Sequence, residues 1–167
     1  MFHKILTSER LVLEPMQVAD APFILELVNT PGWLTFIGDR QVSSLESAVN
    51  YINTFDNNAD ALFWVVKSKS EAIPLGVVSF IQRSYLPYRD IGFAFLPQYS
   101  KKGYAFEAAN RIFEHVKQDP DFQVLLATTL TTNENSQRLL EKLGLIYIQK
   151  ITVGEELLMV YSSTGQM

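Results

Sequence analysis

The alternation of apolar and polar positions along the chain predicts an ordered series of strands and helices. Short runs rich in β-branched and aromatic residues predict about seven strands, over residues 10–13, 61–67, 75–82, 91–95, 124–131, 146–153 and 156–162. Apolar residues that repeat at helical spacing predict about four helices, over residues 20–30, 44–55, 103–118 and 135–143. The order β-α-α-β-β-β-α-β-α-β-β predicts an α/β fold with a mixed central sheet, in a single domain that covers residues 1–167.

Helix ends carry their own local signals. Asp20 suits the N-cap of the first helix, and Pro22 is tolerated in the first turn that follows it. The pattern Ser43-x-x-Glu46 predicts a capping box for the second helix. Gly144 suits the position that follows the last helix.

Composition narrows the classes of function. The chain has 167 residues, 47% of them hydrophobic, and a formal net charge of −4. The size fits one globular domain, and the acidic balance argues against nucleic acid as a partner, since phosphate binding depends on a basic face. A cationic amine is compatible with this balance. The chain has no cysteine, which excludes disulfides, thiolate metal sites and a cysteine nucleophile, and no metal is expected.

The sequence also bears on location. No apolar run approaches the roughly 20 residues that a membrane span needs, so no membrane partner is expected. In the first 15 residues, apolar positions alternate with charged ones, and there is no long apolar run of the kind that a signal peptide contains. We therefore expect a cytoplasmic protein, as a monomer or a homodimer.

The segment from residue 91 to 109, IGFAFLPQYSKKGYAFEAA, predicts a site for an anion. It begins as a strand, breaks at Leu96-Pro97 and enters a helical pattern at Gly103. The first amides of a helix have no intrahelical partner and lie at the positive end of the helix dipole, so they favour a negative charge. Gly103 lets the backbone approach a ligand or adopt a positive φ, and Lys101 and Lys102 add positive charge. From these residues alone, an ordinary surface turn is the alternative.

A second motif follows the apolar run that starts at Val124. It consists of Asn133-x-x-Ser136 and then Leu140-Glu141-Lys142-Leu143-Gly144. With Lys102-Gly103-Tyr104-Ala105, Glu107-Ala108 and the amino-terminal Thr7-Ser8-Glu9-Arg10-Leu11, it resembles the GNAT family of acetyl-CoA-dependent N-acetyltransferases. Within that family the motifs are similar to the RimJ/RimL-like branch of ribosomal-protein N-terminal acetyltransferases. Order and spacing agree over nearly the whole chain.

The resemblance implies a fold and a cofactor site. In the GNAT fold, the strand at residues 91–95 and the strand that begins near Val124 splay apart, and the pantetheine arm of acetyl-CoA lies in the opening. The backbone of the first strand is expected to pair with this arm, and the loop amides are expected to hold the pyrophosphate. The residues expected to bind the cofactor are Phe93, Phe95, Leu96, Lys101, Lys102, Gly103, Tyr104, Ala105, Phe106, Asn133 and Ser136.

Two positions depart from the family pattern. Ser100 stands where many members carry Gln or Arg, which removes a long polar side chain but none of the amides. Leu140 stands where many relatives place a tyrosine that acts as the general acid. We expect Ser136 or water to protonate the departing thiolate; Tyr104 is an alternative, and so is unassisted departure, because a thiol is a stronger acid than an alcohol.

The general base is expected at Asp90, near the position where some relatives place an acidic residue that takes the amine proton through water. A solvated carboxylate at the strand end is the alternative. Glu107 lies in a first helical turn, where its charge favours the helix dipole. His3 is expected in a flexible end and His115 on the surface, so neither is expected to be a catalyst.

The acceptor is expected to contact the loops at residues 33–41 and 84–90. These loops contain Trp33, Phe36, Tyr85 and Tyr88, which favour a peptide end or a partly apolar amine. For Trp33 and Phe36 the alternative is a place in the core.

Taken together, these residues favour an N-acetyltransferase that moves an acetyl group from acetyl-CoA to a primary amine by direct attack in a ternary complex. The amine belongs to a protein N-terminus or to a small molecule. The alternative is a non-catalytic acyl-CoA-binding or interaction module on the same fold, which Leu140 and the lack of an obvious acid or base favour. A nucleotide-binding enzyme of another class has little support, because the patterns G-x-x-x-x-G-K-[ST] and G-x-G-x-x-G are both missing.

Overall fold

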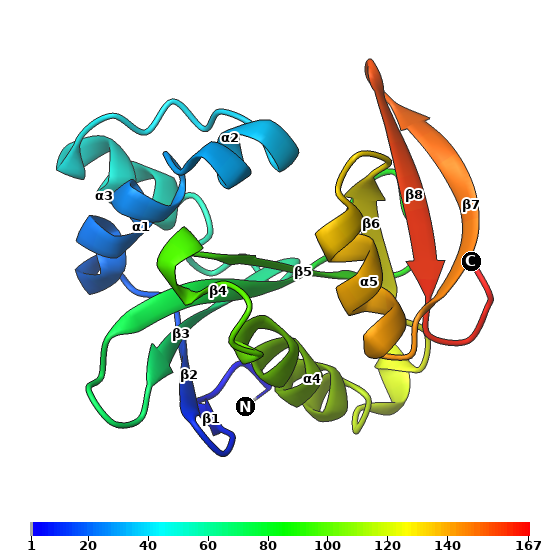
Figure 1. Cartoon of the computed structure of the whole chain (residues 1–167), viewed down its shortest axis with the longest axis horizontal. Helices are drawn as coiled ribbons and strands as arrows, with labels where there is room; N and C mark the ends of the chain where they lie inside the picture. Colours follow the sequence, from blue (N-terminus) through cyan, green and yellow to red (C-terminus); the bar gives the residue numbers. More distant parts are fainter. Residues whose placement is uncertain (1) are drawn as a thin grey trace.

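A computed structural model of the chain describes residues 2–167. It contains one mixed sheet of eight strands with helices on both of its faces (Figure 1). The strands are β1 (Leu6–Thr7), β2 (Leu11–Pro15), β3 (Ala61–Ser68), β4 (Pro74–Ile81), β5 (Asp90–Phe95), β6 (Leu126–Leu130), β7 (Ile146–Val153) and β8 (Glu156–Ser162). The α-helices are α1 (Ala21–Leu27), α2 (Pro31–Phe36), α3 (Leu45–Asn53), α4 (Tyr104–Val116) and α5 (Glu134–Lys142), and the 3-10 helices are η1 (Val18–Asp20), η2 (Pro97–Tyr99) and η3 (Pro120–Phe122).

The predicted α/β fold and its element order are confirmed, with two additions. The structure adds the two-residue strand β1 and the one-turn helix α2, which begins at Pro31 under a cap from the Thr30 hydroxyl. The capping box of α3 also differs from the prediction. Ser44 caps this helix, and its partner is Ser47, whose hydroxyl accepts a hydrogen bond from the Ser44 amide at 2.9 Å.

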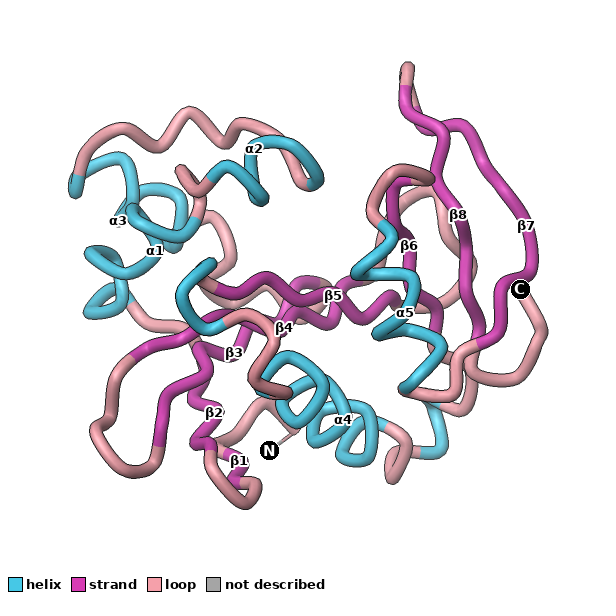
Figure 2. The backbone as a smooth tube through the Cα atoms, viewed as in Figure 1, coloured by secondary structure: helices cyan, strands magenta, loops and turns pink. Residues whose placement is uncertain are grey.

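The strand order is β1-β2-β3-β4-β5-β6-β8-β7, and every neighbouring pair is antiparallel except β5 and β6. The parallel pair has a single registered position, Asp90 opposite Leu126. Beyond it the two strands diverge, so they meet at their amino-terminal ends and open toward their carboxyl ends (Figure 2). The splay that the family resemblance implies is consistent with this geometry.

Alternation of side chains divides the core between the two faces of the sheet. On one face, α4 and α5 cover Val78, Phe80 and Ile91. On the other face, α1, α2 and α3 cover Val65 and Val77. The helices therefore form two layers around the sheet, with the parallel pair in its middle.

The amino-terminal segment is held against this sheet, contrary to the expectation of a flexible end. The His3 ring bonds to the Phe63 carbonyl at 2.9 Å, and the Trp64 indole donates to the Lys4 carbonyl at 2.9 Å. His115 is buried and not on the surface, because its ring stacks on Phe2 and bonds to the Phe2 carbonyl at 2.8 Å.

Two kinds of feature are missing from residues 2–167. None of the helices there combines the length and the apolar character that crossing a membrane requires. In the same residues, no cluster of three His, Asp or Glu side chains has the arrangement of a metal site. The cytoplasmic location and the oligomeric state stay predictions.

Candidate active site

The loop between β5 and α4 adopts an unusual backbone conformation at two of its residues. Lys101 has a φ of 59° and Gly103 has a φ of 80°. Gly103 is the N-cap of α4 and, as a glycine, leaves the helix end without a side-chain cap. A β-carbon at Gly103 would lie 3.3 Å from Nη2 of Arg10, so the glycine is favoured both by its φ and by its surroundings.

The amides of this loop are available to a ligand. Within residues 2–167, no group accepts a hydrogen bond from the amides of residues 101 to 106, and the first helical bond runs from the Glu107 amide to the Gly103 carbonyl at 3.0 Å. Six successive donors therefore lie at the positive end of a helix of 13 residues. Such an arrangement binds a phosphate-sized anion.

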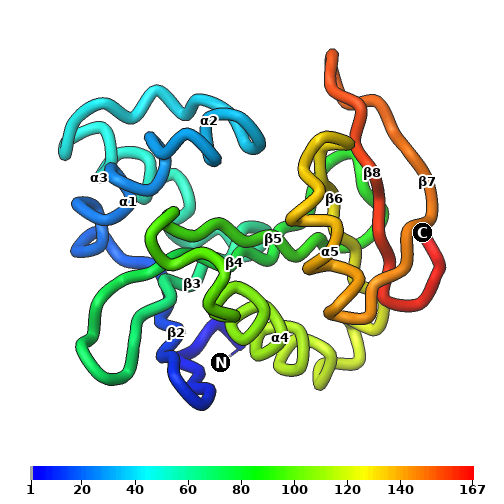
Figure 3. The backbone as a smooth tube through the Cα atoms, in the orientation of Figure 1, coloured from blue at the N-terminus to red at the C-terminus, as the bar shows by residue number. Residues whose placement is uncertain are grey.

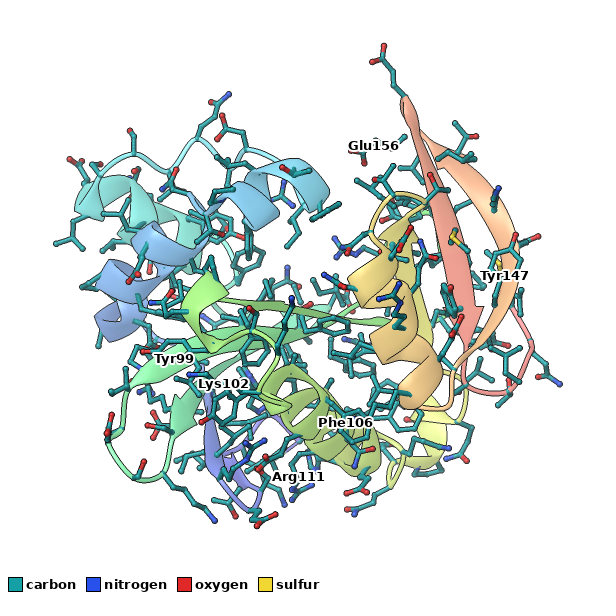
Figure 4. All side chains as sticks on the ribbon, in the orientation of Figure 1. Tyr99, Lys102, Phe106, Arg111, Tyr147 and Glu156 are labelled. Atoms are coloured by element: carbon teal, nitrogen blue, oxygen red, sulfur yellow. The ribbon has the colours of Figure 1, made fainter. Side chains whose placement is uncertain are left out.

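The side chains around these amides are largely occupied by other contacts. The Arg10 guanidinium lies 4.3 Å from the centroid of the Tyr104 ring, and Lys142 lies 4.3 Å from that of Phe106. Lys102 lies 5.9 Å from the Tyr99 ring (Figure 4). Tyr104 and Phe106 thus offer their amides to a ligand, whereas their rings pack against cations of the chain itself.

An ion pair fixes the loop to the amino-terminal strands. Glu107 accepts hydrogen bonds from the Ser8 hydroxyl, the Arg10 amide and the Arg10 guanidinium, each at 2.7 Å. Arg10 Nη1 in turn donates to the Lys102 carbonyl at 3.0 Å. Burial alone would raise the pKa of Glu107, but the bonds from Arg10 and Ser8 outweigh it and hold the pKa below its ordinary value. Glu107 is therefore an ionised structural anchor.

The exposed edge of β5 provides a second set of backbone groups. The Leu96 amide bonds to the Leu75 carbonyl at 2.9 Å, so the backbone groups of every second residue before Leu96 point toward β4. The backbone N–H and C=O groups of Phe93 and Phe95 point the other way, toward the side where β6 has diverged. Phe93 and Phe95 can therefore pair with an extended ligand in the opening. Leu96 cannot do so, since its carbonyl also accepts from the Tyr99 amide, and we leave it out of the proposed cofactor contacts.

The start of α5 brings two predicted residues together. Asn133 is the N-cap, and its Oδ1 accepts from the Ser136 amide at 3.2 Å. Within residues 2–167, the Asn133 Nδ2 group has no hydrogen-bond partner, so this donor is available. The Ser136 hydroxyl is half-buried in the first turn of the same helix. Leu140, at the position where relatives carry a tyrosine, is 1% exposed and packs in the core.

Asp90 does not have the solvated environment that was its alternative. Its side chain is 4% exposed, and it accepts from Arg83 Nε at 3.2 Å and from the Thr128 hydroxyl at 3.4 Å. Burial raises the pKa of Asp90, and Arg83 and Thr128 oppose the rise. Because its oxygens already bind an arginine and a hydroxyl, Asp90 is better placed to position Arg83 than to take a proton from the acceptor.

The predicted acceptor residues do not form one group. Trp33 is 7% exposed and packs in the core under α1 to α3, as its alternative proposed. Its indole nitrogen is the one buried side-chain nitrogen or oxygen of residues 2–167 that has no hydrogen-bond partner. Phe36 is half-buried, whereas Tyr85 and Tyr88 are exposed. The pKa of Tyr85 is raised, mainly by burial and also by the charge of Asp90, and Arg83 opposes the rise.

Sequence reasoning missed Arg83 and Thr128. Thr128 is 38 positions from Asp90 and approaches it only because β5 and β6 pair at one end. Arg83 precedes Asp90 by seven residues, and residues 82–89 between the strands are irregular, so neither helix nor strand periodicity relates the two side chains. The role of Arg10 was open to prediction, because its motif was part of the family resemblance.

Comparison with known proteins identifies relatives over most of the chain. Residues 10–146 match the acetyltransferase (GNAT) domain family. The uncharacterized N-acetyltransferase YoaA of Bacillus subtilis (strain 168) is 24% identical over 144 residues, which cover 84% of this chain and 81% of that protein.

Solved structures share the fold. The ribosomal-protein-S5-alanine acetyltransferase of Vibrio fischeri superposes with a TM-score of 0.79 at 17% identity, covering 95% of this chain and 94% of its own. RimL, a ribosomal L7/L12 alpha-N-protein acetyltransferase solved in complex with coenzyme A, superposes with a TM-score of 0.80 at 16% identity. The match covers 95% of this chain and 97% of the RimL chain. These neighbours have the same fold as this chain.

Proposed function

This chain belongs to the GNAT acetyltransferase family, and we propose that it transfers an acetyl group from acetyl-CoA to the primary amine of a protein N-terminus or a small molecule. The relatives' names and the family identify an acyltransferase. One sheet runs without interruption from β1 to β7, which supports treating residues 1–167 as one N-acetyltransferase domain.

One observation carries the proposal. The six amides of residues 101 to 106, which have no partner within residues 2–167, follow η2, and η2 follows the strand β5, whose free edge faces the opening between β5 and β6. An anionic group on an extended arm fits this combination, because the amides bind the anion and the strand edge pairs with the arm. Acetyl-CoA has this form, with a pyrophosphate followed by the amide-containing pantetheine arm.

Each part of the chain then has a defined task. The amides of residues 101 to 106 hold the pyrophosphate, with Lys101 and Lys102 adding charge. The Phe93 and Phe95 backbones align the pantetheine arm, and Asn133 Nδ2 donates to it. An amide of β5 polarises the thioester carbonyl, which stabilises the oxyanion that forms during attack. Acetyl-CoA supplies the activated acyl group.

Proton transfer needs a donor and an acceptor. The attacking nitrogen forms a bond to the acyl carbon as the carbon–sulfur bond breaks, and a proton passes from the amine to the thiolate. The half-buried Ser136 hydroxyl or water supplies the proton to sulfur, since Leu140 has no ionisable group. On the acceptor side, water near Asp90 takes the amine proton, because the Asp90 oxygens are already bonded.

Calorimetric titration of acetyl-CoA into the Gly103→Val variant tests the cofactor assignment. Valine at a φ of 80° is strained, and its β-carbon meets Arg10, so the loop amides move out of position. We expect the Kd to rise at least about tenfold, which corresponds to about 1.4 kcal/mol. Desulfo-CoA is expected to bind the wild type, and ATP is not.

Gly165→Val is the matched control. Gly165 has a φ of 76°, and no atom lies within 4 Å of the β-carbon it would gain. This variant should bind acetyl-CoA like the wild type, and Gly103→Ala should show a smaller loss than Gly103→Val. Equal affinity in Gly103→Val and wild type would remove the cofactor assignment. Binding without release of free CoA across peptides, polyamines and amino acids would favour the non-catalytic module.

A further inference from the structure

The two faces of the open β5–β6 junction differ in what covers them. Ile91 and Ala127 pack with α4 and α5, so that face holds the helix whose amino terminus is proposed to bind the pyrophosphate. Because side chains alternate along a strand, Asp90 and Thr128 lie on the opposite face, toward α1 to α3. If acetyl-CoA enters from the α4 side, this opposite face is where an amine reaches the thioester.

Hydrogen-bonding capacity at this face is unevenly used. The Asp90 carboxylate is 4% exposed and is bonded to Arg83 Nε and to the Thr128 hydroxyl. The Arg83 side chain is 35% exposed, and within residues 2–167 its two terminal nitrogens have no hydrogen-bond partner. The face therefore offers donors that are fixed in place and a carboxylate whose oxygens are already occupied.

The charged residues around this face also include more than one arginine. Arg40 and Arg83 both act on the Tyr51 hydroxyl of α3, whose pKa burial raises and the two guanidinium groups oppose. Glu156, exposed at the start of β8, is the carboxylate whose charge reaches Tyr85 besides that of Asp90 (Figure 4). A polyamine would need free carboxylates beside the reacting amine, whereas the Asp90 carboxylate at this face is already bonded to Arg83.

We propose that Arg83 binds a carboxylate of the acceptor, so that the preferred acceptor has an acidic group close to the amine that is acetylated. This inference rests on the proposed function and names the substrate class of the same site. Asp90 is a positioning residue in it, since its bond to Nε leaves the two terminal nitrogens of Arg83 aimed away from it, where they can form a bidentate pair. The acceptor is an amino acid or a peptide with an acidic residue next to its amino terminus.

Matched acceptors with and without the carboxylate test the proposal, and each kcat/KM is referred to the concentration of neutral amine, because a neighbouring carboxylate raises the pKa of the amine. Alanine is compared with alaninamide, and a peptide that begins Ala-Asp with one that begins Ala-Asn, with spermidine as a third class. In the wild type, kcat/KM for the carboxylate member of a pair should exceed that of its amide twin by about tenfold. The first pair measures preference for an amino acid and the second measures preference for a peptide.

Three variants then assign the preference to Arg83. Arg83→Gln should bring the ratio close to one, chiefly through KM. The double variant Arg83→Gln/Asp90→Asn should do the same without leaving a buried charge unpaired. Asp90→Asn alone should lower the ratio, but less than Arg83→Gln does, because it weakens the bond that orients Arg83 and leaves the guanidinium in place. Since each ratio is measured on one preparation, the fraction of folded enzyme does not affect it.

Arg138→Gln is the control, because Arg138 is 73% exposed and its ion pair within residues 2–167 is with Glu134 on α5. It should keep the wild-type ratio.

Three outcomes would each overturn the proposal: a wild-type ratio near one, a ratio unchanged in Arg83→Gln, or a preference for spermidine that Glu156→Gln removes. If acetyl-CoA binds and no acceptor releases CoA, the proposed function fails separately. Equal affinities of each acceptor pair for the CoA-bound protein would then overturn the role of Arg83.

Discussion

The Asn133 side chain has more hydrogen-bonding capacity than the end of α5 uses. Its Oδ1 caps the helix through the Ser136 amide, while its Nδ2 donors have no partner within residues 2–167. A serine at this position can accept the same cap bond but cannot supply the amide donor. The two roles are therefore separable by substitution.

We expect Asn133→Ala to lower the free energy of unfolding by about 1 kcal/mol through loss of the cap. The same variant should weaken acetyl-CoA binding by about 1 kcal/mol through loss of the Nδ2 bond. Asn133→Ser should keep the stability and lose only the affinity. Chemical denaturation and calorimetric titration measure the two quantities, and an affinity that Asn133→Ser leaves intact would contradict a cofactor contact.

Single residues also mark the limit of sequence-based prediction. Gly103 was predictable as the backbone-permissive residue of the loop, because the strand and helix patterns on either side locate a helix start there. The environment of Leu96 was not, since the partner of its amide depends on the register between β4 and β5. For Trp33 the sequence offered both an acceptor contact and a place in the core, and the packing of α2 on α1 and α3 decides for the core.

At the scale of elements, the turn between β1 and β2 is joined to α4 by one half-buried carboxylate. Glu107 lies in the first turn of α4 and binds groups of residues 8 and 10. The loop that carries the six amides is therefore held from its helical side by the amino-terminal strands. Order in the anion site depends on this contact.

The Glu107→Gln variant should lower the free energy of unfolding at pH 7 by about 2 kcal/mol, since a charged acceptor of three bonds is lost. The pKa of Glu107 is lower in the folded protein, so its stabilising effect is complete above about pH 5 and is lost as the pH falls through the folded-state pKa. The difference in Tm between wild type and variant should thus shrink on acidification. Glu114→Gln, on the exposed side of the same helix, should show no such difference.

Element types were easier to predict than element ends. The hairpin strands at 146–153 and 156–162 match the prediction residue for residue, because Gly154 and the apolar runs delimit them. The short elements β1 and α2 escaped prediction. Two residues or one turn give too little periodicity, and both depend on pairing or capping by distant or neighbouring groups.

For the whole molecule, the junction of β5 and β6 divides the sheet into two parts. Strands β1 to β5 lie on one side and β6 to β8 on the other, as the colours along the chain show (Figure 3). One registered pair joins them within the sheet. A ligand that fills the opening would complete the hydrogen bonding of the β5 edge.

Hydrogen exchange on acetyl-CoA binding tests this arrangement. The amides of Phe93 and Phe95 should exchange at least about tenfold more slowly with saturating acetyl-CoA, because the pantetheine arm becomes their partner. Leu96 is an internal control, since its amide is already bonded to Leu75. Equal protection of Leu96 and Phe95 would indicate general stiffening and not pairing along the edge, which residue-resolved NMR distinguishes.

The order of elements and the family were predictable at this scale because motif spacing extends along nearly the whole chain. The cluster of Arg83, Asp90 and Thr128 was not, because it forms only where two strands meet and then separate. Sequence reasoning thus located the cofactor site, which is built from contiguous residues, and missed the part of the acceptor face that is assembled from three separate elements.

The proposed anion site is made of main-chain groups, so it responds unusually to mutagenesis. Every residue except proline presents the same N–H group, so most side-chain replacements in residues 101 to 106 leave the proposed ligands in place. An alanine scan of the loop would therefore register only the strain at Gly103, whereas replacing a single amide by an ester, or a residue by proline, would remove a proposed ligand directly.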